Sequence, residues 1–170
     1  MTFEGIVREW CRKYKYMRDS KDNRRFFFTD STAGVVELAK GIKEEQSPCV
    51  VMESDVEGGG PIGRPEMNYA IYFFVMARKM ADGDEAAVAK NKAKEHARNF
   101  LSWLKDRHDR EIADDIDGDF ARIDLDGYIS YTTVGPLQNG WFAVLVQIER
   151  DEPLDLCVDE NLYDTTDTEP

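Results

Sequence analysis

The stretch from Asn68 to Lys79 (NYAIYFFVMARK) constrains the fold of this chain more than any other feature, because it is apolar on two sides. In an extended strand, successive side chains point to opposite faces of the sheet. One face would carry Tyr69, Ile71, Phe73, Val75 and Ala77, and the other Ala70, Tyr72, Phe74 and Met76. The β-branched and aromatic content favours a strand over a helix. A strand without a polar face needs cover on both sides, so we predict that residues 68–79 form a central strand.

Other segments predict the strands around it. Residues 49–56 (CVVMESDV) have the composition of a strand, and residues 128–149 alternate in a way that is typical of a hairpin. Asn139 and Gly140 predict its tight turn, because both residues accept positive φ angles. The second half of this hairpin is apolar on both faces, as residues 68–79 are, so we expect the two to be neighbours in the sheet.

Three helices are predicted. Residues 1–19 place their large apolar side chains at spacings of three and four: Phe3, Ile6, Val7, Trp10, Tyr14 and Met17. A short strand or extended connector at 24–29 precedes a second helix, which Asp30 or Ser31 can cap. The longest helix covers 85–105, and its alanine-rich face can approach the sheet closely.

The element order predicts one α+β domain over residues 1–153, followed by an acidic C-terminal tail at 154–170. We expect a four- to five-stranded, mostly antiparallel sheet with helices packed on it. The long helix lies across one face. The other face must be covered by the N-terminal helix, by the tail or by another subunit, which favours a homo-oligomer.

The charge distribution limits the possible partners. A net charge of −12 argues against nucleic acid as the main ligand. Residues 1–25, which include Arg12 and Lys13, hold eight Lys or Arg against four Asp or Glu, whereas 149–170 hold nine acidic residues and one Arg. A contact between the basic end of one subunit and the acidic end of the next would build a ring.

The sequence carries none of the usual signals for membrane insertion, secretion or metal binding. No apolar run approaches the length of a membrane span, and the first 19 residues mix charges into every turn, unlike a signal peptide. The three cysteines lie far apart, which argues against a zinc site or a disulfide framework. We therefore expect a protein of the cell interior.

The segment 57–67 (EGGGPIGRPEM) predicts a long hairpin tip. It lacks the Gly-Lys-Ser/Thr ending of a phosphate-binding loop and the spaced glycines of a dinucleotide site, so we expect no cofactor. A tip of this kind often orders against a partner. The residues predicted to contact the partner there are Gly58, Gly59, Gly60, Pro61 and Arg64.

The possible catalytic groups are few. Glu53, Asp55 and Glu57 share a strand face and could hold a cation or form an acid–base pair, although a solvated strand end is the favoured interpretation. Residues 106–126 are acidic, but their glycines stand out of register with calcium-binding loops. His96 has no visible nucleophile partner, so a solvated or edge position is expected. We predict no catalytic residue and no metal site.

The layout resembles a known family. A strand opens after a proline (Ser47-Pro48-Cys49), the alanine-rich helix ends in Phe100-Leu101 and Leu104, and the last strand begins Gly140-Trp141. Over about residues 30–150 this order resembles the tail terminator and tail completion proteins of bacteriophages and prophages. The resemblance implies a ring, commonly of six subunits, that joins the tail tube to the head.

The same resemblance implies a virion assembly protein that is not an enzyme and carries no cofactor. Its partners would be further copies of itself and a tail-tube or head-completion protein, in the host cell interior or the assembled virion. Residues 57–67 and 106–126 would be its contact elements. An alternative is a small cytoplasmic binding or regulatory module that engages a partner through 57–67; a metal-dependent enzyme is less favoured.

Overall fold

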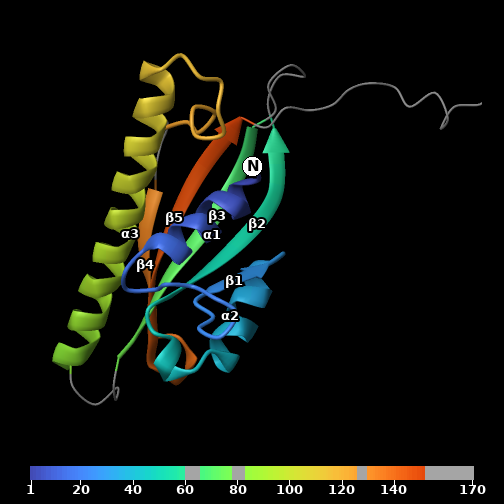
Figure 1. The fold of residues 1–170 in the computed structure, drawn as a ribbon. Coiled ribbons are helices and arrows are strands. Elements are labelled where there is room, and N and C mark those ends of the chain that lie inside the picture. The colour runs from blue at the N-terminus through green and yellow to red at the C-terminus, as the bar shows by residue number, and fades with distance from the viewer. Residues whose placement is uncertain (60–65, 78–82, 126–129, 152–170) are drawn as a thin grey trace, which may run out of the picture.

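A five-stranded mixed sheet forms the centre of the molecule (Figure 1). The structure, a computed structural model, describes residues 1–59, 66–77, 83–125 and 130–151. Its strands are β1 (Phe26–Thr29), β2 (Cys49–Gly59), β3 (Glu66–Met76), β4 (Ser130–Val134) and β5 (Trp141–Asp151), in the order β1-β2-β3-β5-β4. The helices are α1 (Phe3–Lys13), α2 (Thr32–Gly41) and α3 (Gly83–Ala113). The predicted α+β class is confirmed.

Strand β3 is the central strand, as its sequence predicts. It pairs antiparallel with β2 on one side and with β5 on the other. Phe73, for example, lies between Val50 and Val144 in register, and every β3 residue from Ala70 to Val75 is buried. β1 joins β2 in parallel, while β4 joins β5 antiparallel.

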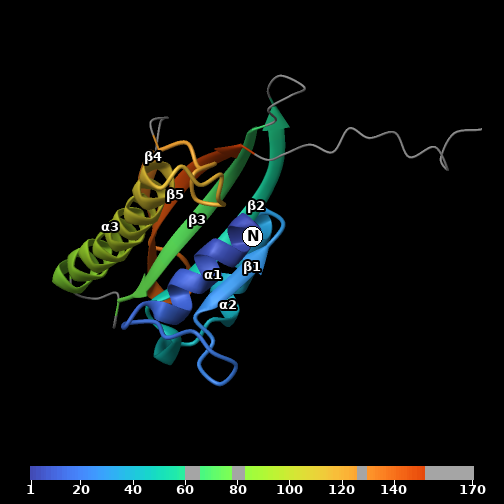
Figure 2. The same ribbon diagram turned by 45° about the horizontal axis from the view of Figure 1, so that its top comes forward.

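Helices α1 and α3 cover the same face of the sheet (Figure 2). Trp10 of α1 meets the rings of Phe73 and Phe100 edge-on, with centroid distances of 5.7 and 5.3 Å. The buried side chains of α3 nearest its start are small: Ala89, Ala93 and Ala97. Because alanine adds little bulk, α3 lies close to β3 and β5, as its sequence predicts.

Helix α2 covers part of the second face, which corrects the expected arrangement. Its Val35 and Ala39 join Phe74 and Trp141 in a second buried cluster. The N-terminal helix does not serve this face, since it shares the first one with α3. Beyond α2 the second face shows exposed polar residues at Asn68, Thr132 and Gln147. Its uncovered part is therefore mostly polar, as in antiparallel sheets with one face in water.

The N-terminal helix is shorter than the predicted 1–19. It ends at Lys13, where Tyr14 takes an extended conformation. Asp19 holds the following turn, because its Oδ1 accepts hydrogen bonds from the amides of Arg25 and Phe26 at 2.6 and 2.9 Å. Met17 still reaches the core, but from this turn. The apolar spacing thus predicts the buried residues correctly, but it places the end of the helix too late in the chain.

The long helix is longer than the predicted 85–105. The apolar spacing stops at Leu104, yet α3 continues to Ala113. Ion pairs one turn apart support the extension: Lys105 Nζ with Asp109 Oδ2 at 2.8 Å, and Arg110 Nη2 with Asp106 Oδ2 at 2.9 Å. Residues 106–113, predicted as part of an acidic connection, are therefore helical.

The two hairpins also differ in detail from the prediction. β2 runs to Gly59 and β3 begins at Glu66. The two strands of the first hairpin therefore stay paired closer to its tip than the predicted ranges 49–56 and 68–79 imply. Asn139 and Gly140 do take positive φ angles of 65° and 80°. They belong, however, to a short 3₁₀ turn within a longer connection from β4 to β5, not to a two-residue turn.

Replacing Phe73 should test the central role of β3. Phe73→Ala removes a fully buried ring that contacts Trp10 and Phe100, so we expect the free energy of unfolding to fall by about 3–5 kcal/mol. Phe28→Ala on β1 is the matched control, because that ring is 39% exposed and its loss should cost about 1 kcal/mol. Urea unfolding of both variants checks this, and equal losses would contradict it.

Candidate functional site

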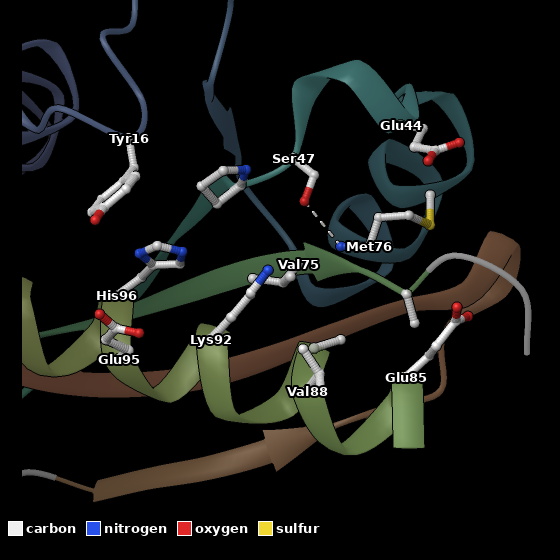
Figure 3. A pocket seen from close by; sticks show the side chains of 13 residues that line it. Tyr16, Glu44, Ser47, Val75, Met76, Glu85, Val88, Lys92, Glu95 and His96 are labelled. Carbon is white, nitrogen blue, oxygen red and sulfur yellow. Dashed lines mark hydrogen bonds between the residues drawn. The ribbon is translucent and has the colours of Figure 1, made fainter. Parts of the chain in front are cut away.

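A groove runs beside the first half of α3 (Figure 3). Its volume is about 690 Å³. It lies between α3, the end of β3, Tyr16, and the segment that leads into β2. Its lining residues are Tyr16, Glu44, Ser47, Pro48, Val75, Met76, Ala77, Glu85, Val88, Ala89, Lys92, Glu95 and His96.

The walls of the groove are fixed by local hydrogen bonds. Ser47 Oγ accepts a bond from the Met76 amide at 3.1 Å, which ties the segment before β2 to the end of β3. On the same segment, the Arg25 guanidinium donates to the Ser47 carbonyl at 2.6 Å. Tyr16 reaches the groove because the chain leaves helical geometry at Tyr14.

His96 forms one end of the groove, and only 7% of its surface is exposed. Its Nδ1 lies 2.9 Å from the Tyr14 hydroxyl, and its ring also meets those of Tyr14 and Tyr16. The sequence predicts a solvated or edge position for His96, and the solvated one is wrong. The residues that bury His96 come from the turn after α1, and the helical spacing within 85–105 holds no signal for them.

The electrostatic surroundings keep His96 neutral near pH 7. Burial lowers its pKa below the ordinary 6.5; Glu95 opposes the shift, and Lys92 adds to it. Burial, with Glu95 and Tyr16, raises the pKa of Tyr14 to about 12, so its hydroxyl stays protonated. The neutral imidazole of His96 and the neutral phenol of Tyr14 therefore form an uncharged hydrogen-bonded pair. Either imidazole tautomer is compatible with this hydrogen bond.

The groove combines an apolar floor with a charged rim. Val75, Ala77 and Ala89 are buried beneath it, while Val88 is 51% exposed. Among the described lining residues, Glu85 and Glu95 carry exposed carboxylates and Lys92 carries an exposed ammonium group, while Glu44 on the opposite wall already has an interaction partner.

The structure describes two of the five residues that are predicted to contact a partner at the hairpin tip. Gly58 and Gly59 lie in β2, paired with Met67 and Glu66, and so are strand residues and not part of a loop. Gly60, Pro61 and Arg64 lie outside the described residues.

Arg12 and Lys13 are exposed in the last turn of α1, where positive charge complements the helix dipole. Lys13 forms an ion pair with Glu9 one turn earlier. Both residues lie apart from the lining of the groove. The acidic tail at 154–170, their predicted counterpart, is outside the described residues.

Glu53 has a structural explanation. Its side chain is buried, accepts a hydrogen bond from Thr32 Oγ1 at 2.8 Å, and accepts another from Tyr72 Oη at 3.2 Å. These bonds connect β2 to α2 and to β3. The favoured expectation of a solvated strand end is wrong for Glu53, while the side chains of Asp55 and Glu57 are outside the described set.

The acidic residues in the last turn of α3 and in the segment after it use their carboxylates in local contacts. Glu111 Oε2 accepts from the amides of Phe120 and Ala121 at 2.9 Å each, and Asp119 pairs with buried Arg150 at 3.1 Å. Across residues 1–59, 66–77, 83–125 and 130–151, no group of three or more His, Cys, Asp or Glu is placed to hold a metal ion. The described helices also include none with the length and hydropathy of a membrane span.

The described cysteines are poorly suited to nucleophilic chemistry. Cys11 and Cys49 are buried thiols, and burial raises the pKa of each well above its ordinary value. The groove places His96 beside a phenol and carboxylates. Such an arrangement can bind a ligand through charge, hydrogen bonds and apolar contact.

Sequence comparisons identify no relative. A scan against models of known protein families found no match, and a search of curated proteins found none either.

The pH dependence of stability should report the burial of His96. Because its pKa is lowered on folding, the unfolded chain binds the proton more tightly than the native protein does. We expect the free energy of unfolding to fall as the pH decreases below about 6.5 and the loss to level off below the native pKa. Urea unfolding between about pH 7.5 and 5, where most carboxylates stay ionised, measures it.

Two histidine variants provide the comparison. His96→Gln should show a smaller loss over this pH range, whereas His108→Gln on the exposed end of α3 should keep the His96-dependent loss. An unchanged pH dependence in His96→Gln would contradict the assignment.

Proposed function

We propose that this chain is a non-enzymatic assembly protein that acts as a homo-oligomer, with a ring like that of phage tail terminators as its working form. The observation that carries the proposal is the outer end of the first hairpin. There Gly58 and Gly59 pair with Met67 and Glu66, which pair in turn with Arg150 and Asp151 at the end of β5. We call these four residues the β2–β3 arm.

The arm lies at one end of the sheet. In both views β2 runs past the beginning of α1 (Figures 1 and 2). The burial pattern agrees, since Glu66 and Asn68 are exposed whereas β3 is continuously buried from Ala70. β1 pairs with β2 only as far as Glu53, so no described strand pairs with the outer edge of β2 from Ser54 to Gly59. Such an edge offers backbone groups to a neighbouring subunit, which is how sheet-based contacts form.

The roles of other groups support an assembly protein over an enzyme. Glu53 and Glu111, two of the acidic residues considered as possible ligands or acid–base groups, accept hydrogen bonds from within the fold. The described thiols are buried and protonated. In this proposal the partners are further copies and a tail-tube or head-completion protein, inside the host cell or in the virion.

The proposal predicts an oligomer that depends on the arm. We expect light scattering after size exclusion to give a discrete multiple of the protomer mass over a wide concentration range. Replacing residues 55–68 by Asn-Gly joins Ser54 and Tyr69, which pair in register, through a two-residue hairpin turn and removes the arm. This variant should keep its circular dichroism spectrum and lose the oligomer.

Asn91→Arg is the control, because that exposed α3 position lies outside the arm and should leave the mass unchanged. A wild-type protein that stays monomeric at high concentration and low salt would overturn the proposal. That result would favour the alternative of a small binding module that meets its partner through residues 57–67.

A further inference from the structure

We propose that a groove between β1 and α2 binds the acidic segment 154–160 (LDLCVDE) of a neighbouring copy, which adds to the sheet as a strand antiparallel to β1. The segment lies outside the described residues, which end at Asp151. The inference rests on the proposed homo-oligomer, because the segment comes from a second copy of the chain.

The β1–α2 groove is apolar and partly open. Its volume is about 440 Å³, and it lies at the edge of the sheet, where α2 runs beside β1 (Figure 1). Apart from its own helix, no atom lies within 4 Å of the position that a Cβ of Gly41 would take. The lining residues all belong to the described stretch 1–59: Arg24, Phe27, Phe28, Thr29, Gly34, Glu37, Leu38, Gly41 and Ile42.

β1 has backbone groups available to a further strand, because it is the first strand in the order of the sheet. The Val50 amide of β2 donates to the Arg25 carbonyl at 2.8 Å. Backbone groups alternate between the two sides of a strand, so Phe27 also faces β2, whereas Phe26 and Phe28 face outward. Side chains already bond the outward groups of Phe26. The amide and carbonyl of Phe28 bond no described residue, so they can pair with an added strand.

The pattern of residues 154–160 fits this groove. In an extended strand one face carries three apolar side chains and a carboxylate: Leu154, Leu156, Val158 and Glu160. We place Cys157 opposite Phe28, so that these two residues exchange backbone hydrogen bonds. In this antiparallel register Val158 lies beside Phe27 in the groove, and Glu160 reaches the end of the groove at Arg24.

The charges of the lining favour an acidic segment. Glu37 already forms an ion pair with Lys40. The Arg24 Nε donates to a backbone carbonyl of β1 at 3.3 Å, and the guanidinium carbon lies 4.7 Å from the centre of the Phe27 ring. Arg24 forms no ion pair with a described residue. Its remaining N–H groups can therefore donate to the carboxylate of Glu160.

The reach of the segment favours the groove of another copy. Through the register of the strands between them, Thr29 is level with Gln147 of β5. Asp151 lies about 13 Å beyond that level, and β5 is three strand spacings, about 14 Å, away from β1. The resulting distance of about 20 Å takes about six extended residues. Within one protomer Leu154 and Leu156 would be used in this crossing, so they can reach only the groove of a neighbour.

The experiment is a disulfide link in the full chain between the natural Cys157 and the cysteine introduced by Phe28→Cys. A hydrogen-bonded antiparallel pair has its Cα atoms about 5.5 Å apart, which suits a disulfide. The two described cysteines are buried and do not compete. We expect oxidised glutathione to give covalent chains of more than two subunits on a non-reducing gel, whereas links between two Cys157 residues stop at dimers. Ala33→Cys, at an exposed α2 position outside the groove, is the matched control and should give no such ladder.

Further variants on the Phe28→Cys background locate the contact. Gly41→Leu fills the open space at the groove and should slow the linking about tenfold. Ala33→Leu adds the same side chain to α2 outside the groove and should leave the rate unchanged. Arg24→Gln and Glu160→Gln should each slow the linking about threefold, and the two together should slow it no further.

Three results would overturn the inference. These are linking no faster than in the Ala33→Cys control, a link that forms only within single chains, and equal slowing by Gly41→Leu and Ala33→Leu. A link within single chains would place the segment in the groove of its own protomer. Light scattering of the wild-type protein tests the oligomer separately. An oligomer that does not form the link leaves the proposed function standing and ends only this inference, whereas a monomeric wild-type protein contradicts both.

Discussion

The rest of the structure depends on the need to bury both faces of β3. Its side chains from Ala70 to Val75 are buried although they point alternately to opposite faces. Two layers of helices are therefore required, and the chain supplies α1 and α3 on one face and α2 on the other. The positions of the other elements follow from this requirement, including the groove, which lies where α3 passes the end of β3.

Much of this arrangement could be predicted from the sequence. The two-sided apolar pattern of residues 68–79 and 141–149 is strong, because burial in a sheet interior is the main reason for such a pattern. It identified the neighbouring strands and the core positions. Element ends were less accurate, since they depend on contacts outside the apolar pattern: the Asp19 turn that follows α1, and the Lys105–Asp109 and Asp106–Arg110 ion pairs that extend α3.

The groove could not be predicted in the same way. Glu44, Lys92 and Tyr16 are far apart in the sequence and look like ordinary surface residues, and they are brought together only by the turn after α1 and by the segment before β2. His96 had a partial signal, its place beside an apolar helix face, but Tyr14 lies 82 positions away. Local acidic patterns point instead to residues such as Glu53 and Glu111. The hydrogen bonds that these two side chains accept stabilise the fold.

Two small side chains, one after the end of β3 and one on α3, have a consequence beyond close packing. Ala77 and Ala89 form part of the groove lining because neither fills the space above it. The groove thus exists because these two side chains are single methyl groups, and its depth depends on both of them. A single change to a larger apolar residue at either position would fill part of it without altering any charge. Shape and charge are therefore encoded by separate residues, so each can change during evolution while the other is retained.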